Sequence, residues 1–230
     1  MKRSQFLRRF YSPLPEAKLK LWPNGNITQK WADNPHLYSK FFGLKDDLSL
    51  ATCGHTGIDI VTHHGDPVYA CHDGKVMNIV TTRNTVGGLV VRLISHWYNG
   101  EGKWEGKRFF STTAYAHLDE IFVKVGDQVK AGETILGTEG NTGFVISGGT
   151  PYWGNAPGGA GTHLHLSWYE WNEDKTPRFP NCMRSSSDPL LAIMDQNPNF
   201  TGLKIYLENA MGYLRAMQRK LEGLKTKVDA

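Results

Sequence analysis

The feature that most constrains the fold is a series of short apolar and β-branched runs between Gly54 and Tyr169, separated by turns rich in Gly, Asp and Asn. Runs of this kind predict short strands joined by tight turns. We therefore expect a mostly β, antiparallel core with few helices. Two longer stretches, 95–112 and 147–162, interrupt the pattern and are expected to be long loops.

An H-x-H motif lies near the end of this region. His163 and His165 belong to a run, 163–169, that reads as a strand. Successive side chains of a strand point to opposite faces, so both imidazoles would point one way while Leu164 and Leu166 point into a core. The pattern is typical of a functional face opposite a packing face.

An H-x-x-x-D motif lies near the beginning of the region. His55 and Asp59 are four residues apart, but Gly57 and the β-branched run that follows it oppose a helix. In a straight strand four residues span roughly 13 Å, which is too far for both side chains to bind one ion. We therefore expect a bend near Gly57.

Together the two motifs suggest a metal site. Two imidazoles and one carboxylate make a three-ligand zinc site with one position left for water. One histidine of the H-x-H pair would then be free for proton transfer, and the segment 114–118 offers another, His117. The alternative is a set of scattered surface histidines, since each motif alone is weak evidence. The remaining histidines have no partner at ligand spacing, and we expect them to be surface or structural residues: His36, His63, His64, His72 and His96.

Further segments lie between the two histidine motifs in the order found in one family. They are Gly65–Ala70, Asp73–Val76, Tyr115–Leu118, Val125–Val129, Gly132–Gly137 and Gly140–Gly143. With the two motifs, this set resembles the lysostaphin/LytM-type zinc endopeptidases, which cut peptidoglycan cross-links. The resemblance covers about Phe42 to Met194. It implies an antiparallel β-sandwich or barrel-like peptidase core with long loops and a cell-wall hydrolase activity.

The resemblance also implies roles for five residues. Zn²⁺ would be held by His55, Asp59 and His165, and would lower the pKa of its water and polarise the scissile carbonyl. The general-base and oxyanion-stabilising work would fall to His117 and His163, without a fixed division between them. The sequence does not say which cross-link is cut.

Two other readings stay open. The first is a LytM-like binding, activator or structural virion module without catalysis, against which all five site residues are present. The second is a biotinyl/lipoyl-type carrier barrel, prompted by the segment 125–133, although no lysine stands at a hairpin tip in the carrier's manner.

Aromatic residues lie on the two expected loops, beside His117 and His163. We expect them to be walls of a substrate groove, and the alternative is that they only fasten the loops to the core. The candidate substrate-binding residues are Trp97, Tyr98, Trp104, Tyr152 and Trp153.

We expect three parts in the chain. These are an irregular arm over residues 1–25, the peptidase domain over 26–196 and an amphipathic helix over 197–230. The ends are basic, and the residues between 20 and 204 carry 14 basic and 18 acidic side chains, a net of −4. Such ends suit an anionic wall or an acidic partner, or they merely aid solubility.

Two targeting signals, a membrane span and a secretory signal, bear on where the protein is expected to act. No run is long enough for a membrane span, and the basic start has no apolar stretch behind it, so no secretory signal is expected. We therefore expect a bacteriophage lysin or virion component that acts on the bacterial wall, or else a mature or trimmed chain, with no nucleic-acid partner. Cys53, Cys71 and Cys182 make a poor disulfide framework, although a Cys53–Cys71 bridge stays open.

The last part of the chain shows a heptad seam over residues 203–228. It predicts one amphipathic helix. Lysines flank the seam, and no acidic residue at the flanking positions pairs with them. We therefore expect the helix to dock on another protein's acidic surface, on the chain's own acidic body or on an anionic membrane, and not on its own copy.

Overall fold

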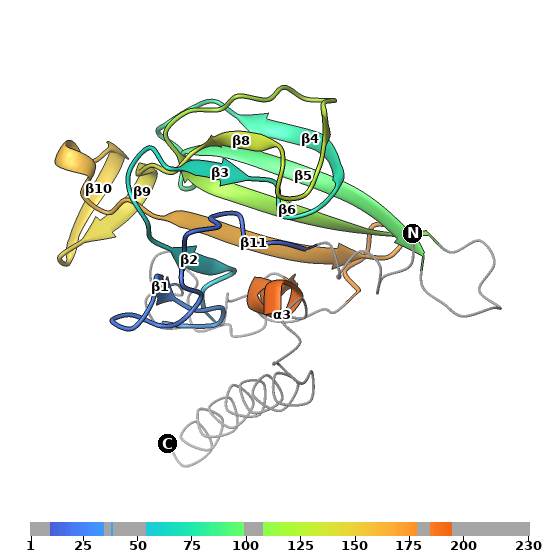
Figure 1. Ribbon diagram of the computed structural model, residues 1–230, viewed down its shortest axis with the longest axis horizontal. Helices are drawn as coiled ribbons and strands as arrows, with labels where there is room; N and C mark the ends of the chain where they lie inside the picture. Colours follow the sequence, from blue (N-terminus) through green and yellow to red (C-terminus); the bar gives the residue numbers. More distant parts are fainter. Residues whose placement is uncertain (1–9, 35–37, 39–53, 99–107, 179–184, 195–230) are drawn as a thin grey trace, which may run out of the picture.

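The computed structural model describes residues 10–34, 38, 54–98, 108–178 and 185–194. One long antiparallel sheet dominates them, with strand order β1-β2-β11-β6-β5-β4-β7 and with β12 paired to β11 (Figure 1). The strands of this sheet are β1 (Ile27–Gln29), β2 (Ile58–Ile60), β4 (Gly74–Val80), β5 (Leu89–Tyr98), β6 (Arg108–Leu118), β7 (Gln128–Val129), β11 (Leu164–Trp171) and β12 (Ser186–Ser187). The predicted mostly β, antiparallel fold is thereby confirmed.

Two small two-stranded sheets accompany the long one. β3 (Pro67–Tyr69) pairs with β8 (Ile135–Thr138), and this pair covers one face of the long sheet (Figure 1). β9 (Thr142–Ser147) pairs with β10 (Thr150–Asn155) at one end of the molecule, where a short 3₁₀ turn, Pro157–Gly159, follows. The core lies between the long sheet and the β3–β8 pair.

Alternation along the long strands separates the core face from the opposite face. Leu93 on β5, Tyr115 on β6 and Leu166 on β11 have no exposed surface and point into the core. Their neighbours along each strand, among them Arg92 and Ala114, are partly exposed on the other face. One face of the sheet is therefore packed, and the other is available for a site.

The N-terminal segment contributes to the core although it contains little regular structure. Phe10 and Leu14 are 0% and 2% exposed, and the ring of Phe10 lies 5.6 Å from that of Trp168. The backbone N–H of Tyr11 also donates to the carbonyl of Cys71. Residues 10–14, within the expected irregular arm, are thus part of the folded body.

The structure corrects the expectation of two uninterrupted long loops. The stretch 147–162 contains β10, because Gly148 and Gly149 adopt φ angles of 55° and 81° and make a two-residue hairpin turn. The stretch 95–112 contains the end of β5 and the start of β6, and residues 99–107 lie outside the described residues.

The described chain ends in α3 (Pro189–Met194), whose first turn is capped by the Asp188 carboxylate, which accepts from the N–H of Leu190. The predicted helix over 203–228 lies outside the described residues. Among the described helices, none has both the length and the apolar character that a membrane crossing requires. Cys71 is buried and forms no disulfide, while Cys53 and Cys182 lie outside the described residues.

Candidate active site

Strand register brings Asp59 and His165 together. β2 and β11 are antiparallel neighbours, and Asp59 stands directly opposite His165 in the ladder. The expected bend is present at Thr56 and Gly57, just before β2 begins. Gly57 is needed there, because a Cβ at this position would lie 2.2 Å from the carbonyl oxygen of Leu166. The bend returns His55 to the same end of the ladder as Asp59.

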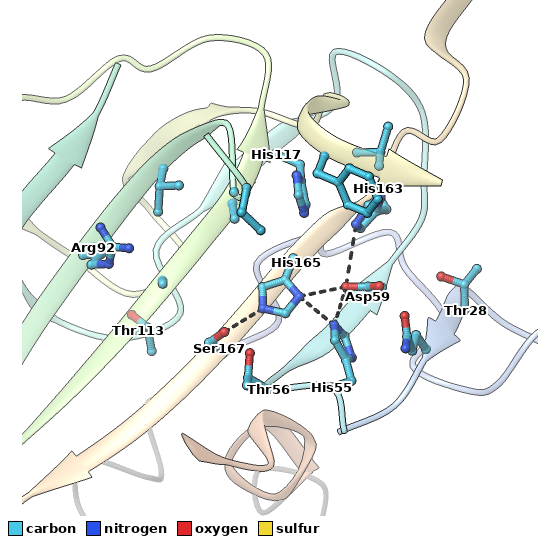
Figure 2. Close-up of a pocket in the computed structure, with 18 of the residues that line it drawn as sticks. Thr28, His55, Thr56, Asp59, Arg92, Thr113, His117, His163, His165 and Ser167 are labelled. Carbon is cyan, nitrogen blue, oxygen red and sulfur yellow. Dashed lines mark hydrogen bonds and ion pairs between the residues drawn. The ribbon is translucent and has the colours of Figure 1, made fainter. Parts of the chain in front are cut away.

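Three potential ligand atoms converge at this point (Figure 2). Nε2 of His55 lies 2.7 Å from Nδ1 of His165 and 3.1 Å from Oδ1 of Asp59. Nδ1 of His165 lies 3.0 Å from the same carboxylate oxygen. Two nitrogen ligands of one tetrahedral zinc ion would be about 3.3 Å apart, so only small shifts separate this arrangement from coordination geometry.

The hydrogen bonds of the outer ring nitrogens determine which ring nitrogens of His55 and His165 carry a lone pair toward the candidate metal centre. Nδ1 of His55 lies 3.1 Å from the carbonyl oxygen of Lys30, and Nε2 of His165 lies 2.7 Å from Oγ of Ser167. If each outer nitrogen donates its proton, each inner nitrogen presents a lone pair. Two such lone pairs and a carboxylate facing one another would repel, and a shared cation removes that repulsion. The donor set therefore fits a zinc ion.

Burial and neighbouring charges set the ionisation of Asp59 and His165. Burial alone would raise the pKa of Asp59, but the imidazoles of His55 and His163 hold the pKa of this carboxyl well below its usual range. Burial lowers the pKa of His165. At neutral pH the carboxylate is ionised and the His165 ring is neutral, which are the forms that bind a cation.

His117 reaches the site through an irregularity in β6. Regular alternation would place its side chain on the core face beside Tyr115. Instead His117 has a φ of 63°, and the register between β5 and β6 shifts between Leu89 and Val91. A left-handed residue opposite a register shift re-aims its side chain, a device that concentrates near active sites. The ring of His117 thus lies on the groove side (Figure 2).

His117 and His163 stand side by side above the three converging atoms. Their ring centroids are 4.5 Å apart. Nδ1 of His117 lies 2.7 Å from the carbonyl of Thr142, and Nδ1 of His163 lies 2.8 Å from that of Gly161. If both Nδ1 atoms donate, both Nε2 atoms carry lone pairs. Nε2 of His163 lies 3.7 Å from Oδ1 of Asp59, so it is directed toward the candidate metal centre.

These five residues line an open groove on the exposed face of the long sheet. Its floor comes from β5, β6 and β11, and one wall comes from β9. A second wall is formed by residues that precede the histidine motifs: Trp22, Thr28, Gln29 and Tyr38. This second wall was not anticipated from the sequence, and no motif there could have indicated it.

The predicted substrate-binding residues fall in different places. Tyr152 and Trp153 lie on β10 and are not among the groove-lining residues. Trp153 stands directly opposite Phe144 in the β9–β10 ladder, with ring centroids 4.9 Å apart, and Phe144 lines the groove. Trp97 and Tyr98 end β5, where only the backbone is described, and Trp104 lies outside the described residues.

Two of the other histidines have roles that the sequence analysis expected. His72 is completely buried, with Nε2 2.9 Å from Oγ1 of Thr113 and Nδ1 2.9 Å from the carbonyl of Asp73. His63 has a 90% exposed side chain beside Asp66. The first is a structural residue and the second a surface residue.

The chain matches one known protein family over part of its length. Residues 53–177, more than half of the chain, match the family described as peptidase family M23, and the chain belongs to that family. The matched range contains all five residues of the candidate site. It omits the N-terminal segment that packs into the core and forms the second groove wall.

Several characterised proteins are similar to parts of the chain. The glycyl-glycine endopeptidase ALE-1 of Staphylococcus capitis is 34% identical over 121 residues, which is 52% of this chain and 29% of that protein. The peptidoglycan DD-endopeptidase ShyB of Vibrio cholerae is 38% identical over 81 residues, which is 35% of this chain and 16% of that protein. The chain thus spans less than a third of the length of either relative.

One solved structure that is similar to part of the chain is a lysostaphin domain. The catalytic domain of lysostaphin from Staphylococcus simulans aligns at 27% identity and a TM-score of 0.38, covering 60% of this chain and 77% of that chain. The family assignment rests on the match over residues 53–177.

Proposed function

We propose that this protein is a zinc-dependent endopeptidase that hydrolyses peptide cross-links of bacterial peptidoglycan. The observation that carries the proposal is the convergence of His55, Asp59 and His165, with two further imidazoles directed at the same point. Relatives in the same family are named for endopeptidase activity on glycyl-glycine and peptidoglycan bonds, which gives the proposal its substrate class.

In this proposal zinc, when bound, supplies a Lewis acid for the scissile carbonyl and lowers the pKa of a water. The protein holds the ligands in place through the Lys30 carbonyl and the Ser167 hydroxyl. These outer contacts fix the tautomer and the orientation of each ring.

His117 and His163 move the protons. Each is oriented by a carbonyl at Nδ1, so that Nε2 can accept the proton of the attacking water or donate one to the leaving amine. The protonated ring would also stabilise the negative charge of the tetrahedral oxyanion. Among the described residues that line the groove there is no glutamate. The proposal therefore assigns the role of general base to these two imidazoles.

The groove supports an extended substrate. It is open along the sheet, and its floor runs along β11 from His165 past Ser167 to Tyr169. A peptide cross-link lying along this floor would present its backbone to the candidate metal centre.

The test is digestion of purified peptidoglycan sacculi of defined cross-link chemistry, followed by mass spectrometry of the new termini. We expect new amino and carboxyl termini at a cross-link peptide bond, loss of activity with a chelator and recovery with added zinc. A protein that binds zinc but produces no new termini from any cross-link type would support the non-catalytic binding module instead. The roles as phage lysin and virion component stay predictions.

A further inference from the structure

Three aromatic side chains lie together on the groove floor, at the end away from the candidate metal centre. Tyr169 and Trp171 on β11 and Phe110 on β6 all line the groove. The ring centroid of Trp171 lies 6.0 Å from that of Tyr169 and 6.1 Å from that of Phe110, with interplanar angles of 21° and 17°. These three side chains form one aromatic surface, which we call the aromatic platform.

Strand pairing gathers the three rings on the groove face of the sheet. Side chains along β11 alternate, so Tyr169 and Trp171 point to the same face as His165. Phe110 stands directly opposite Trp171 in the β6–β11 ladder. The indole N–H of Trp171 donates to Oγ1 of Thr112 at 2.9 Å, which fixes the orientation of the ring. The platform is therefore held in place before any ligand arrives.

The rings of the platform contribute little to the core. Tyr169 and Trp171 are only half-buried, whereas the residues with which they alternate, Trp168 and Glu170, are each 2% exposed on the other face. Core packing accounts for the Trp168 ring, but it does not account for two further rings on the outer face of the same strand. Aromatic side chains gathered on an accessible face are typical of an interaction site.

The distance from the candidate metal centre indicates which part of a substrate reaches the platform. At about 3.4 Å of rise per residue, the Cα atoms of Tyr169 and Trp171 lie about 14 Å and about 20 Å from that of His165 along β11. In peptidoglycan with D-alanyl cross-links, a stem peptide of about four residues, which spans about 13 Å when extended, separates the cross-link bond from the sugar that carries the peptide. A stem peptide that lies along β11 from the metal centre therefore brings its sugar to the aromatic platform.

The charges that line the groove suit the same occupant. Among the described residues that line it, Asp59 is the only carboxylate, and it belongs to the candidate metal centre. Lys175, on the turn that follows β11, is exposed and lines the groove, while Glu173 and Asp174 of the same turn do not line it. Because a stem peptide carries free carboxylates, it would meet a cation and no fixed anion along this part of the floor.

We propose that the aromatic platform binds the sugar to which the stem peptide of the substrate is attached. The proposal rests on the proposed function and adds a glycan subsite to it. Indole and phenol rings are large, rigid and amphipathic surfaces, and one face of a pyranose ring presents apolar C–H bonds. Their contact buries apolar surface on both partners while the sugar hydroxyls at the ring edge stay in water. The chain would therefore cut cross-links between glycan strands in preference to cross-links between free peptides.

The experiment compares two synthetic substrates that share one D-alanyl–diaminopimelyl cross-link. In the first substrate both stem peptides are acetylated at the amino terminus, and in the second each stem carries the N-acetylglucosaminyl–N-acetylmuramyl disaccharide instead. Both are cut with the zinc-loaded wild type, Trp171→Leu, Tyr169→Leu and the control Phe122→Leu, after denaturant unfolding has shown that each variant folds. Phe122 is 57% exposed and is not a groove-lining residue.

We expect the disaccharide to lower the KM of the wild type on the order of 10-fold, with kcat nearly unchanged. Trp171→Leu and Tyr169→Leu should each lose most of this advantage, while their KM for the sugar-free substrate stays at the wild-type value. Phe122→Leu should match the wild type on both substrates. Tyr169→Leu keeps the bond between Trp171 and Thr112, so it decides the matter if Trp171→Leu does not fold.

Two results would overturn the proposal. Equal KM values of the wild type for the two substrates would show that the platform does not bind the sugar. An equal rise in KM on both substrates in the platform variants would show that the rings only support the groove.

A wild type that cuts neither substrate would mean that the proposed function fails for this bond. Calorimetric binding of the uncross-linked disaccharide tetrapeptide and of the bare tetrapeptide, to the wild type and to Tyr169→Leu, then decides the role of the platform. Tighter binding of the disaccharide form that is lost in Tyr169→Leu supports the glycan subsite, and equal binding of the two ligands to the wild type overturns it.

Discussion

Nδ1 of His165 lies 3.0 Å from Oδ1 of Asp59, because the two residues face each other across the β2–β11 ladder although they are 106 positions apart in the chain. The pairing of β2 with β11 therefore sets the distance between these two candidate ligands. A metal bound here would link β2 to β11, and its affinity would depend on both strands.

Removal of either of these two residues should abolish stoichiometric zinc binding. Wild-type protein is expected to contain about one zinc per chain, and Asp59→Ala or His165→Ala should weaken zinc affinity by more than about 100-fold, since a lost ligand costs more than a lost outer contact. Elemental analysis after dialysis measures this. Asp66→Ala, an acidic residue outside the groove, is the control and should retain its zinc. Full occupancy in both ligand variants would refute the ligand assignment.

Removal of either proton-transfer candidate should separate catalysis from metal binding. His117→Ala and His163→Ala should keep their zinc but lose on the order of 100-fold or more in kcat, because both act on protons or on the oxyanion. The measurement is turnover on a defined cross-link peptide together with zinc content. A variant that retains near-normal turnover removes its residue from the mechanism.

Gly57→Ala should damage the fold and the site together. The added Cβ would meet the carbonyl oxygen of Leu166 at 2.2 Å, so β2 and β11 must separate. We expect a loss of about 3 kcal/mol in the free energy of unfolding and weaker zinc binding. Denaturant unfolding with and without zinc measures both. Gly148→Ala, at a hairpin turn with open space around it, should cost only about 1 kcal/mol and leave zinc affinity unchanged.

Glu139 should make stability depend on pH. Its carboxyl group is buried and accepts hydrogen bonds from the N–H and the hydroxyl of Thr62, and burial raises its pKa to about 7. The folded state therefore binds a proton more tightly than the unfolded state does. The resulting stabilisation is fully present below the unfolded pKa near 4.5 and is lost as pH rises through about 7.

Glu139→Gln should remove this dependence. The amide can still accept from the Thr62 N–H without carrying a charge. Between pH 4.5 and 8 the free energy of unfolding of the wild type should therefore fall by up to about 3 kcal/mol relative to the variant. Urea unfolding across that range tests it, and parallel curves for the two proteins would show that Glu139 is not the group responsible.

The fold class and the cluster of candidate metal ligands could be predicted from the sequence because their signals are local. Alternating and β-branched runs indicate strands whatever their partners. The H-x-H spacing places two imidazoles on one face, and Gly57 marks the bend that returns His55 toward Asp59. A two-imidazole and carboxylate set then limits the chemistry to few ions.

Other features depend on tertiary contacts and could not be predicted. The segment that carries Tyr152 and Trp153 is expected from the sequence to be part of a loop, but the Gly148–Gly149 turn makes it a strand in which Trp153 stands opposite Phe144. The N-terminal segment has no motif, and only packing shows that Phe10 fills the core and that Tyr38 borders the groove.

The sequence by itself determined which residue types are present and the local backbone periods, and with them the antiparallel β class and the candidate ligands. The tertiary structure alone decided three features. They are the register that sets Asp59 opposite His165, the left-handed backbone conformation that turns the His117 side chain toward the groove, and the strand pairing that places Arg92 in the groove. The physical reason is that propensity acts over a few residues, whereas register and groove shape arise from packing between strands that are distant in the chain.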